Sequence, residues 1–188
     1  MNGRNDIINV LGISGSLRKN SFNTGLIRAA QKLKPENMEI KLADISSIPL
    51  YNQDVEAAGL PEPVKKFRDE IAAADALLFA VPEYNFSVSG VLKNAIDWSS
   101  RPPKGSPLNG KVFAIMGAGG RMGTTRAQYH FRQIAVFTNM HTFNKPEVAV
   151  TDAREKFDAD GNLTDERTAD QIKRLLESLS EWVKRFKD

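Results

Sequence analysis

Short apolar runs alternate with longer amphipathic segments along the whole chain, and this alternation constrains the fold more than any other feature. Five runs have the length and composition of β-strands, at residues 7–13, 38–43, 76–81, 111–116 and 147–150. Segments with apolar residues at helical spacing lie between and after them, at residues 24–33, 64–74, 91–99, 124–137 and 165–187. Strands that alternate with helices form a parallel sheet with right-handed crossovers. The sequence therefore predicts an α/β fold with five parallel strands.

The apolar patterns of the five strands also predict their order in the sheet. The first, third and fourth are apolar throughout, as central strands buried on both faces should be. The second and fifth look like edge strands. This favours a flavodoxin-like three-layer sandwich with the strand order 2-1-3-4-5. No repeat, low-complexity tract or linker divides the 188 residues, so we expect a single domain over residues 1–188.

The loop after the first strand combines small residues, hydroxyls and one arginine, and it leads directly into a helix. Unpaired backbone N–H groups and the positive end of a helix dipole favour an anion at such a place. Ser16, Ser21 and Asn23 offer hydrogen bonds, and Arg18 offers a charge-assisted contact. The loop therefore predicts a phosphate site, although it matches neither the Walker nor the dinucleotide fingerprint. The simpler alternative is a serine-rich turn in which Ser21 or Asn23 caps the helix.

The loops after the third and fourth strands, residues 82–90 and 117–126, are also unusual. The first begins with Pro82 and is rich in polar and aromatic residues, which suits the edge and face of a planar ring. The second has four glycines in seven positions, which permits close backbone approach to a ligand. The alternatives are a surface turn with a cap at Ser87 or Ser89, and a flexible loop. In the predicted sheet, all three loops open at the edge where ligands bind.

Several motifs resemble the NADPH-dependent FMN reductase family, and most closely its bacterial quinone and chromate reductase branch. They are residues 15–18 with Ser21 and Asn23, then residues 82–85, 89–98, 126–130 and 144–147, so the resemblance covers nearly the whole chain. It implies a noncovalent FMN whose phosphate contacts Ser16, Arg18, Ser21, Phe22 and Asn23. It places the flavin ring against Pro82, Glu83, Tyr84 and Asn85, with Gly117, Gly119 and Gly120 on the other side. Ala118 and Thr124 replace a serine and a glycine usual in the family.

The resemblance also implies an activity. Hydride would pass from NADPH or NADH to N5 of FMN, and then to a quinone, azo compound, nitroaromatic, chromate or free flavin, in a ping-pong sequence. It implies no catalytic side chain. It further implies a homodimer or homotetramer, with Arg126, Tyr129 and Glu147 at a tetramer contact. Separately from the resemblance, Phe86 and Arg101 are candidates for the border of a neighbour's substrate pocket. A local ion pair within one subunit is the alternative for the polar residues at that contact.

Composition limits other functions. The chain has no cysteine, which excludes disulfides, thiol redox chemistry and cysteine-ligated metals. Its net charge is only +3 with no basic stripe, so we expect no nucleic-acid partner. His130 and His141 lack metal-ligand spacing, so we expect no metal. No run predicts a membrane span or a signal peptide, and a cytoplasmic location is expected. A flavodoxin-like electron carrier and a non-catalytic nucleotide-sensing module remain as alternative functions.

Overall fold

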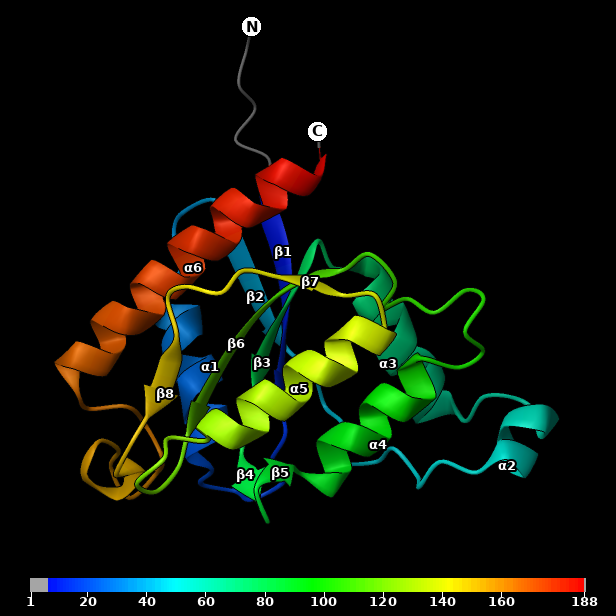
Figure 1. Cartoon of the computed structure of the whole chain (residues 1–188), viewed down its shortest axis with the longest axis horizontal. Coiled ribbons are helices and arrows are strands. Elements are labelled where there is room, and N and C mark those ends of the chain that lie inside the picture. The colour runs from blue at the N-terminus through cyan, green and yellow to red at the C-terminus, as the bar shows by residue number, and fades with distance from the viewer. Residues whose placement is uncertain (1–6, 188) are drawn as a thin grey trace, which may run out of the picture.

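A parallel sheet forms the centre of the computed structural model, which describes residues 7–187 (Figure 1). The strand order is β2-β1-β3-β6-β7, and β8 also pairs with β6. The bounds are β1 Ile8–Ser14, β2 Met38–Leu42, β3 Ala76–Ala80, β6 Val112–Ala118, β7 His141–Thr142 and β8 Val148–Val150. The predicted order 2-1-3-4-5 is confirmed, but two short strands share the fifth position. The chain is out of the sheet over residues 143–147, and this segment contains Pro146, which has no N–H to donate to a ladder.

Alternate side chains of the central strands supply two separate cores. On one face, Val10, Leu78 and Ala114 pack with the helices α1 (Phe22–Leu33) and α6 (Glu166–Lys187). On the other, Leu11 and Phe113 pack with the helices α3 (Glu62–Ala73), α4 (Gly90–Ser99) and α5 (Thr125–Phe137). These two groups of helices lie to the left and to the right of the sheet in Figure 1. The predicted three-layer sandwich is therefore confirmed.

The structure adds elements that the sequence patterns did not predict. Between β2 and α3, where the sequence patterns predicted no strand or helix, lies a short helix, α2 (Gln53–Ala58), in which no residue is buried. Its first residues follow Asn52, whose side-chain oxygen accepts a hydrogen bond from Asp54 N at 2.8 Å, and Gly59 ends the helix. The loop after β3 is a hairpin of two very short strands, β4 (Glu83–Tyr84) and β5 (Ser87–Val88). A 3₁₀ turn, η1 (Ala153–Glu155), follows β8.

The start of α6 yields a prediction with a defined pH dependence. The Asp165 carboxylate accepts hydrogen bonds from Thr168 N at 2.8 Å and Thr168 Oγ1 at 2.6 Å, and these bonds lower the pKa of Asp165. We expect Asp165→Ala to reduce the free energy of unfolding by about 1 kcal/mol at pH 7, the usual value of such a cap. Because the pKa is lower in the folded than in the unfolded protein, the stabilisation is complete above about pH 4 and fades as the pH falls through the folded-state pKa. Urea unfolding at pH 7 and pH 3 measures this, and an equal difference at both pH values would contradict it.

Among residues 7–187, no helix combines the length and apolarity needed to cross a membrane. The expectation that the chain carries no signal peptide concerns residues 1–6, which lie outside the described part of the chain.

Candidate functional site

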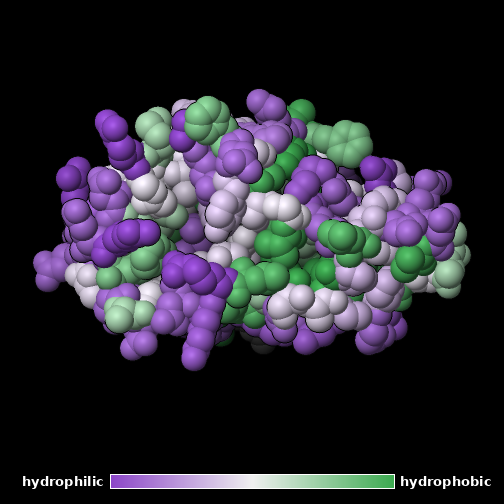
Figure 2. All heavy atoms as spheres, turned by 90° about the horizontal axis from the view of Figure 1, so that it is seen from below, coloured by the Kyte–Doolittle hydropathy of each residue, from purple (hydrophilic) through white to green (hydrophobic). Residues whose placement is uncertain are grey.

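The loops that follow β1, β3 and β6 meet at one end of the sheet, which is the lower end in Figure 1 and faces the viewer in Figure 2. We call residues 15–23 the serine loop, residues 82–89 the hairpin loop and residues 117–124 the glycine loop. Gly15 N donates to Ala80 O at 2.9 Å, which holds the serine loop against the end of β3. The buried Ser89 hydroxyl donates to Gly15 O at 2.6 Å and also caps α4. Apolar atoms gather near the centre of this face, and polar side chains surround them (Figure 2).

The serine loop ends at the first turn of α1. Ser21 caps the helix by accepting a hydrogen bond from Thr24 N at 3.4 Å, so the capping role considered for Ser21 is confirmed. The next two backbone N–H groups, of Phe22 and Asn23, have no acceptor within the helix by geometry. The Arg18 guanidinium lies beside this turn, because its carbon is 4.8 Å from the Phe22 ring centroid. A cation, a hydroxyl loop and a helix N-terminus together form a donor set that fits a phosphate dianion such as that of FMN.

The Asn23 side chain has a structural role that the resemblance did not imply. It is only 5% exposed. Its Oδ1 accepts from Ala118 N at 3.1 Å, and its Nδ2 donates to Ala118 O at 3.0 Å. The amide therefore ties the start of α1 to the end of β6. The backbone N–H of Asn23, and not this engaged side chain, is the group oriented for an anion at the helix N-terminus.

The hairpin loop is anchored to α5 by Glu83. Its carboxylate accepts from Arg126 N at 3.1 Å, from Ala127 N at 3.3 Å and from Arg126 Nε at 2.6 Å. Thr124, the residue before α5, provides no side-chain cap, so Glu83 performs that function from a distant loop. Arg126 thus forms an ion pair within one subunit, as the alternative interpretation expected. Glu147 pairs instead with Lys145, at 3.2 Å.

The other residues of the hairpin loop differ in exposure. Pro82 is buried, whereas Tyr84 and Asn85 are exposed. His130, one of the two histidines, lies on α5 with its Nδ1 at 2.7 Å from Ser87 Oγ. This contact links the hairpin to the middle of α5. The contacts of Glu83 and Ser87 with α5 therefore hold the exposed residues of the hairpin loop in place.

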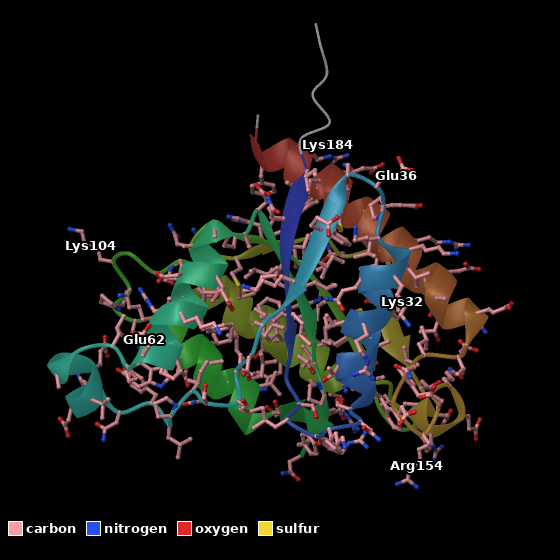
Figure 3. All side chains as sticks on the ribbon, turned by 180° about the vertical axis from the view of Figure 1, so that it is seen from behind. Lys32, Glu36, Glu62, Lys104, Arg154 and Lys184 are labelled. Atoms are coloured by element: carbon pink, nitrogen blue, oxygen red, sulfur yellow. The ribbon has the colours of Figure 1, made fainter. Side chains whose placement is uncertain are left out.

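The glycine loop borders a cavity of about 600 Å³, together with Glu83 and Arg126 of the hairpin and α5. The N–H of Gly119 donates to Val150 O at 3.0 Å, and the carbonyls of Gly119 and Gly120 accept from the N–H groups of Ala153 and Asp152. The segment after β8 therefore supports the loop, a role that the sequence did not predict. Figure 3 shows Arg154 of this segment at the same end of the molecule, opposite Glu36 and Lys184.

Gly117 is required by its surroundings. A Cβ at this position would lie 1.9 Å from Thr124 Oγ1 and 2.6 Å from Val81 O. We therefore expect Gly117→Ala to lower the free energy of unfolding by about 1–3 kcal/mol through overpacking. Gly90→Ala is the matched control, since a Cβ there meets nothing within 4 Å. Chemical denaturation of both variants measures the difference, and equal stabilities would contradict the expected overlap.

Two further observations concern metals and the phosphate end of the site. Within the described part of the chain, no group of three or more histidine, cysteine or acidic residues is placed to hold a metal ion.

A second cavity of about 290 Å³ lies on the β2 side of the serine loop and is lined by Ser16, Arg18 and Thr24, among others. The serine loop is therefore accessible to a ligand from that side.

Comparison with known proteins identifies the family of this chain. The family model described as NADPH-dependent FMN reductase matches residues 8–155. An NAD(P)H-dependent FMN reductase of Pseudomonas aeruginosa is 56% identical over 97% of this chain and 98% of its own. An NADPH:quinone oxidoreductase of Arabidopsis thaliana is 49% identical over 96% of this chain and 94% of its own length. The structure of FerB, a flavoenzyme NAD(P)H:(acceptor) oxidoreductase from Paracoccus denitrificans, superimposes with a TM-score of 0.87 at 34% identity, over 96% of this chain and 99% of that one. The chain therefore belongs to the NADPH-dependent FMN reductase family.

Proposed function

We propose that the protein binds FMN without a covalent bond and passes electrons from NADPH or NADH to a small-molecule acceptor, with quinones as the main class. One observation supports this most strongly. A phosphate-binding donor set at the N-terminus of α1 lies at the same end of the sheet as a cavity of about 600 Å³ between two loops. A flavin mononucleotide needs both features, one for each end of the molecule.

The proposed contacts follow from this arrangement. Ser16 and Arg18, with the capped first turn of α1 (Ser21, Phe22 and Asn23), hold the phosphate. The hairpin loop (Pro82, Glu83, Tyr84 and Asn85) supports one side of the ring, and the glycine loop (Gly117, Gly119 and Gly120) flanks the other. Gly119 and Gly120 line the cavity, whereas Gly117 is buried. Bound FMN supplies the redox chemistry, because its ring accepts a hydride from the nicotinamide and releases electrons to the acceptor. The chain binds and orients the reactants, and we propose no side-chain acid or base.

We further propose a ping-pong order, in which the oxidised nicotinamide leaves before the acceptor enters. The support for this order is the cavity between the hairpin loop and the glycine loop, which both reactants would share to reach the flavin ring. Initial rates at several fixed concentrations of NADPH, with benzoquinone varied, test the order. Parallel lines in a double-reciprocal plot are the expected result. Intersecting lines would show that both substrates bind together and would refute the ping-pong order.

We also propose that the protein is a homodimer or homotetramer in the cytoplasm, where its nicotinamide substrate is produced. The outer surface of α5 supports an oligomer, because Val136 is 82% and Phe137 73% exposed there. Large apolar side chains close together on a surface are typical of subunit contacts. Light scattering at micromolar concentration measures the assembly. A monomeric mass would contradict this part of the proposal.

A further inference from the structure

A cavity of about 140 Å³ lies between α1, the start of α6 and the turn of residues 157–163, and the proposed function does not use it. The polar side chains that line it are those of Arg28, Lys32 and Asn162. Apolar surface comes from Leu33, Leu163 and Ala169. No acidic residue of the described part of the chain lines this cavity. It therefore combines two positive charges with an apolar wall.

Arg28 holds the turn and retains one donor that the chain does not use. Its Nη2 donates to Asp160 O at 3.1 Å and to Gly161 O at 2.8 Å, so the guanidinium has a fixed orientation. Its Nε is buried and has no hydrogen-bond acceptor among residues 7–187. A buried N–H without a partner is unusual in a native protein and indicates a water or an ion beside it. Arg28 therefore offers a charged donor to an acceptor from outside the chain.

A second cation, Lys32, lies one helical turn further along α1 and lines the same cavity. Figure 3 shows Lys32 on the side of α1 next to α6. Like charges at this spacing on a helix repel each other. Asp158 is within the electrostatic reach of Arg28, but its carboxylate is bonded to Asn162 N at 2.7 Å and to Asp160 N at 3.0 Å and does not line the cavity. An anion placed between the two cations would relieve their repulsion.

We propose that this cavity binds a small carboxylate with a short aliphatic chain, such as butyrate. The carboxylate accepts hydrogen bonds from Arg28 Nε and from the ammonium group of Lys32. The aliphatic chain packs against the apolar wall, which an inorganic anion such as phosphate would leave facing water. No residue of the serine loop, the hairpin loop or the glycine loop lines this cavity, so the site is separate from the proposed FMN site.

Isothermal titration calorimetry of FMN-loaded protein with sodium butyrate tests the site, because bound FMN occupies the serine loop that could also attract an anion. We expect a Kd of about 1 mM, which is reasonable for a ligand of this size. Acetate should bind more weakly, by about twofold to fourfold for each methylene removed. Butyramide has the shape of butyrate without its charge, and it should bind about tenfold more weakly or worse.

Lys32→Gln is the variant that tests the residues, because Lys32 is exposed and its loss leaves the hydrogen bonds of Arg28 in place. It should weaken butyrate binding by about tenfold, the effect of one charge-assisted hydrogen bond. Lys65→Gln is the matched control, since Lys65 is an exposed lysine on α3, which packs on the opposite face of the sheet. The control variant should keep the butyrate affinity of the original protein.

Any of four results would overturn the inference. The absence of binding at about ten times the expected Kd would show that the cavity holds water only. Equal affinities for butyrate and butyramide would exclude a role for the two cations. Phosphate binding as tight as that of butyrate would exclude a role for the apolar wall. Equal losses in Lys32→Gln and Lys65→Gln would assign the binding to general attraction of anions by a basic protein.

Discussion

Arg18→Ala is expected to weaken FMN binding by about 10- to 100-fold and to leave riboflavin binding unchanged. A charge-assisted hydrogen bond contributes about 1.5–3 kcal/mol, and this is the free energy that such a fold-change represents. Arg18 is exposed on the serine loop, and its guanidinium lies against the first turn of α1. Riboflavin has the ring of FMN but no phosphate, so it serves as the probe that separates the two ends of the ligand.

Fluorescence titration of the apoprotein at fixed ionic strength measures both dissociation constants. Lys19→Ala is the matched control, because Lys19 is the neighbouring exposed cation and has no proposed phosphate contact. Its loss should change FMN affinity far less than the loss of Arg18. Equal weakening of FMN and riboflavin in Arg18→Ala would show that Arg18 supports the loop generally and does not contact the phosphate.

Asn23→Leu is expected to destabilise the protein even without FMN, by about 2–4 kcal/mol. Leucine has a similar volume and leaves no large cavity, but it removes both partners of the Ala118 backbone. A buried N–H or C=O that loses its partner costs about 1–3 kcal/mol. FMN affinity should fall as well, because the glycine loop is no longer tied to α1.

Urea unfolding of the apoprotein measures this effect free of ligand. Asn20→Leu is the control, since the Asn20 amide donates to Ala159 O at 2.8 Å in an exposed position. Asn20→Leu should lower the free energy of unfolding by less than Asn23→Leu does. If Asn23→Leu kept the stability of the original apoprotein but lost FMN, the Asn23 side chain would be a phosphate ligand and not a structural tie.

The sheet could be predicted from the sequence because its central strands are buried on both faces. β3 and β6 are buried at every residue, and such strands appear as continuous apolar runs. The helix α2 gave no such signal, since it buries no residue and its sequence has no apolar face. The strands β4 and β5 have two residues each, too few for a periodic pattern.

The positions of the three site loops were predicted, but the bonds between them were not. The Ser21 cap is local, because its acceptor and donor are three residues apart. Asn23 and Ala118 are 95 residues apart, and Glu83 and Arg126 are 43 apart. No spacing rule connects such residues, since their contact depends on the finished sheet. The tasks of Asn23 and Glu83 therefore became visible only in the structure.

The most direct test of the central claim is the visible absorbance spectrum of the FMN-loaded protein, recorded without oxygen before and after the addition of NADPH, with NADH in parallel. Our account predicts a flavin band that survives desalting and bleaches at once with at least one nicotinamide, and the faster one identifies the preferred donor. A retained band that neither nicotinamide bleaches would contradict the reductase function and favour an electron carrier or a nucleotide-sensing module.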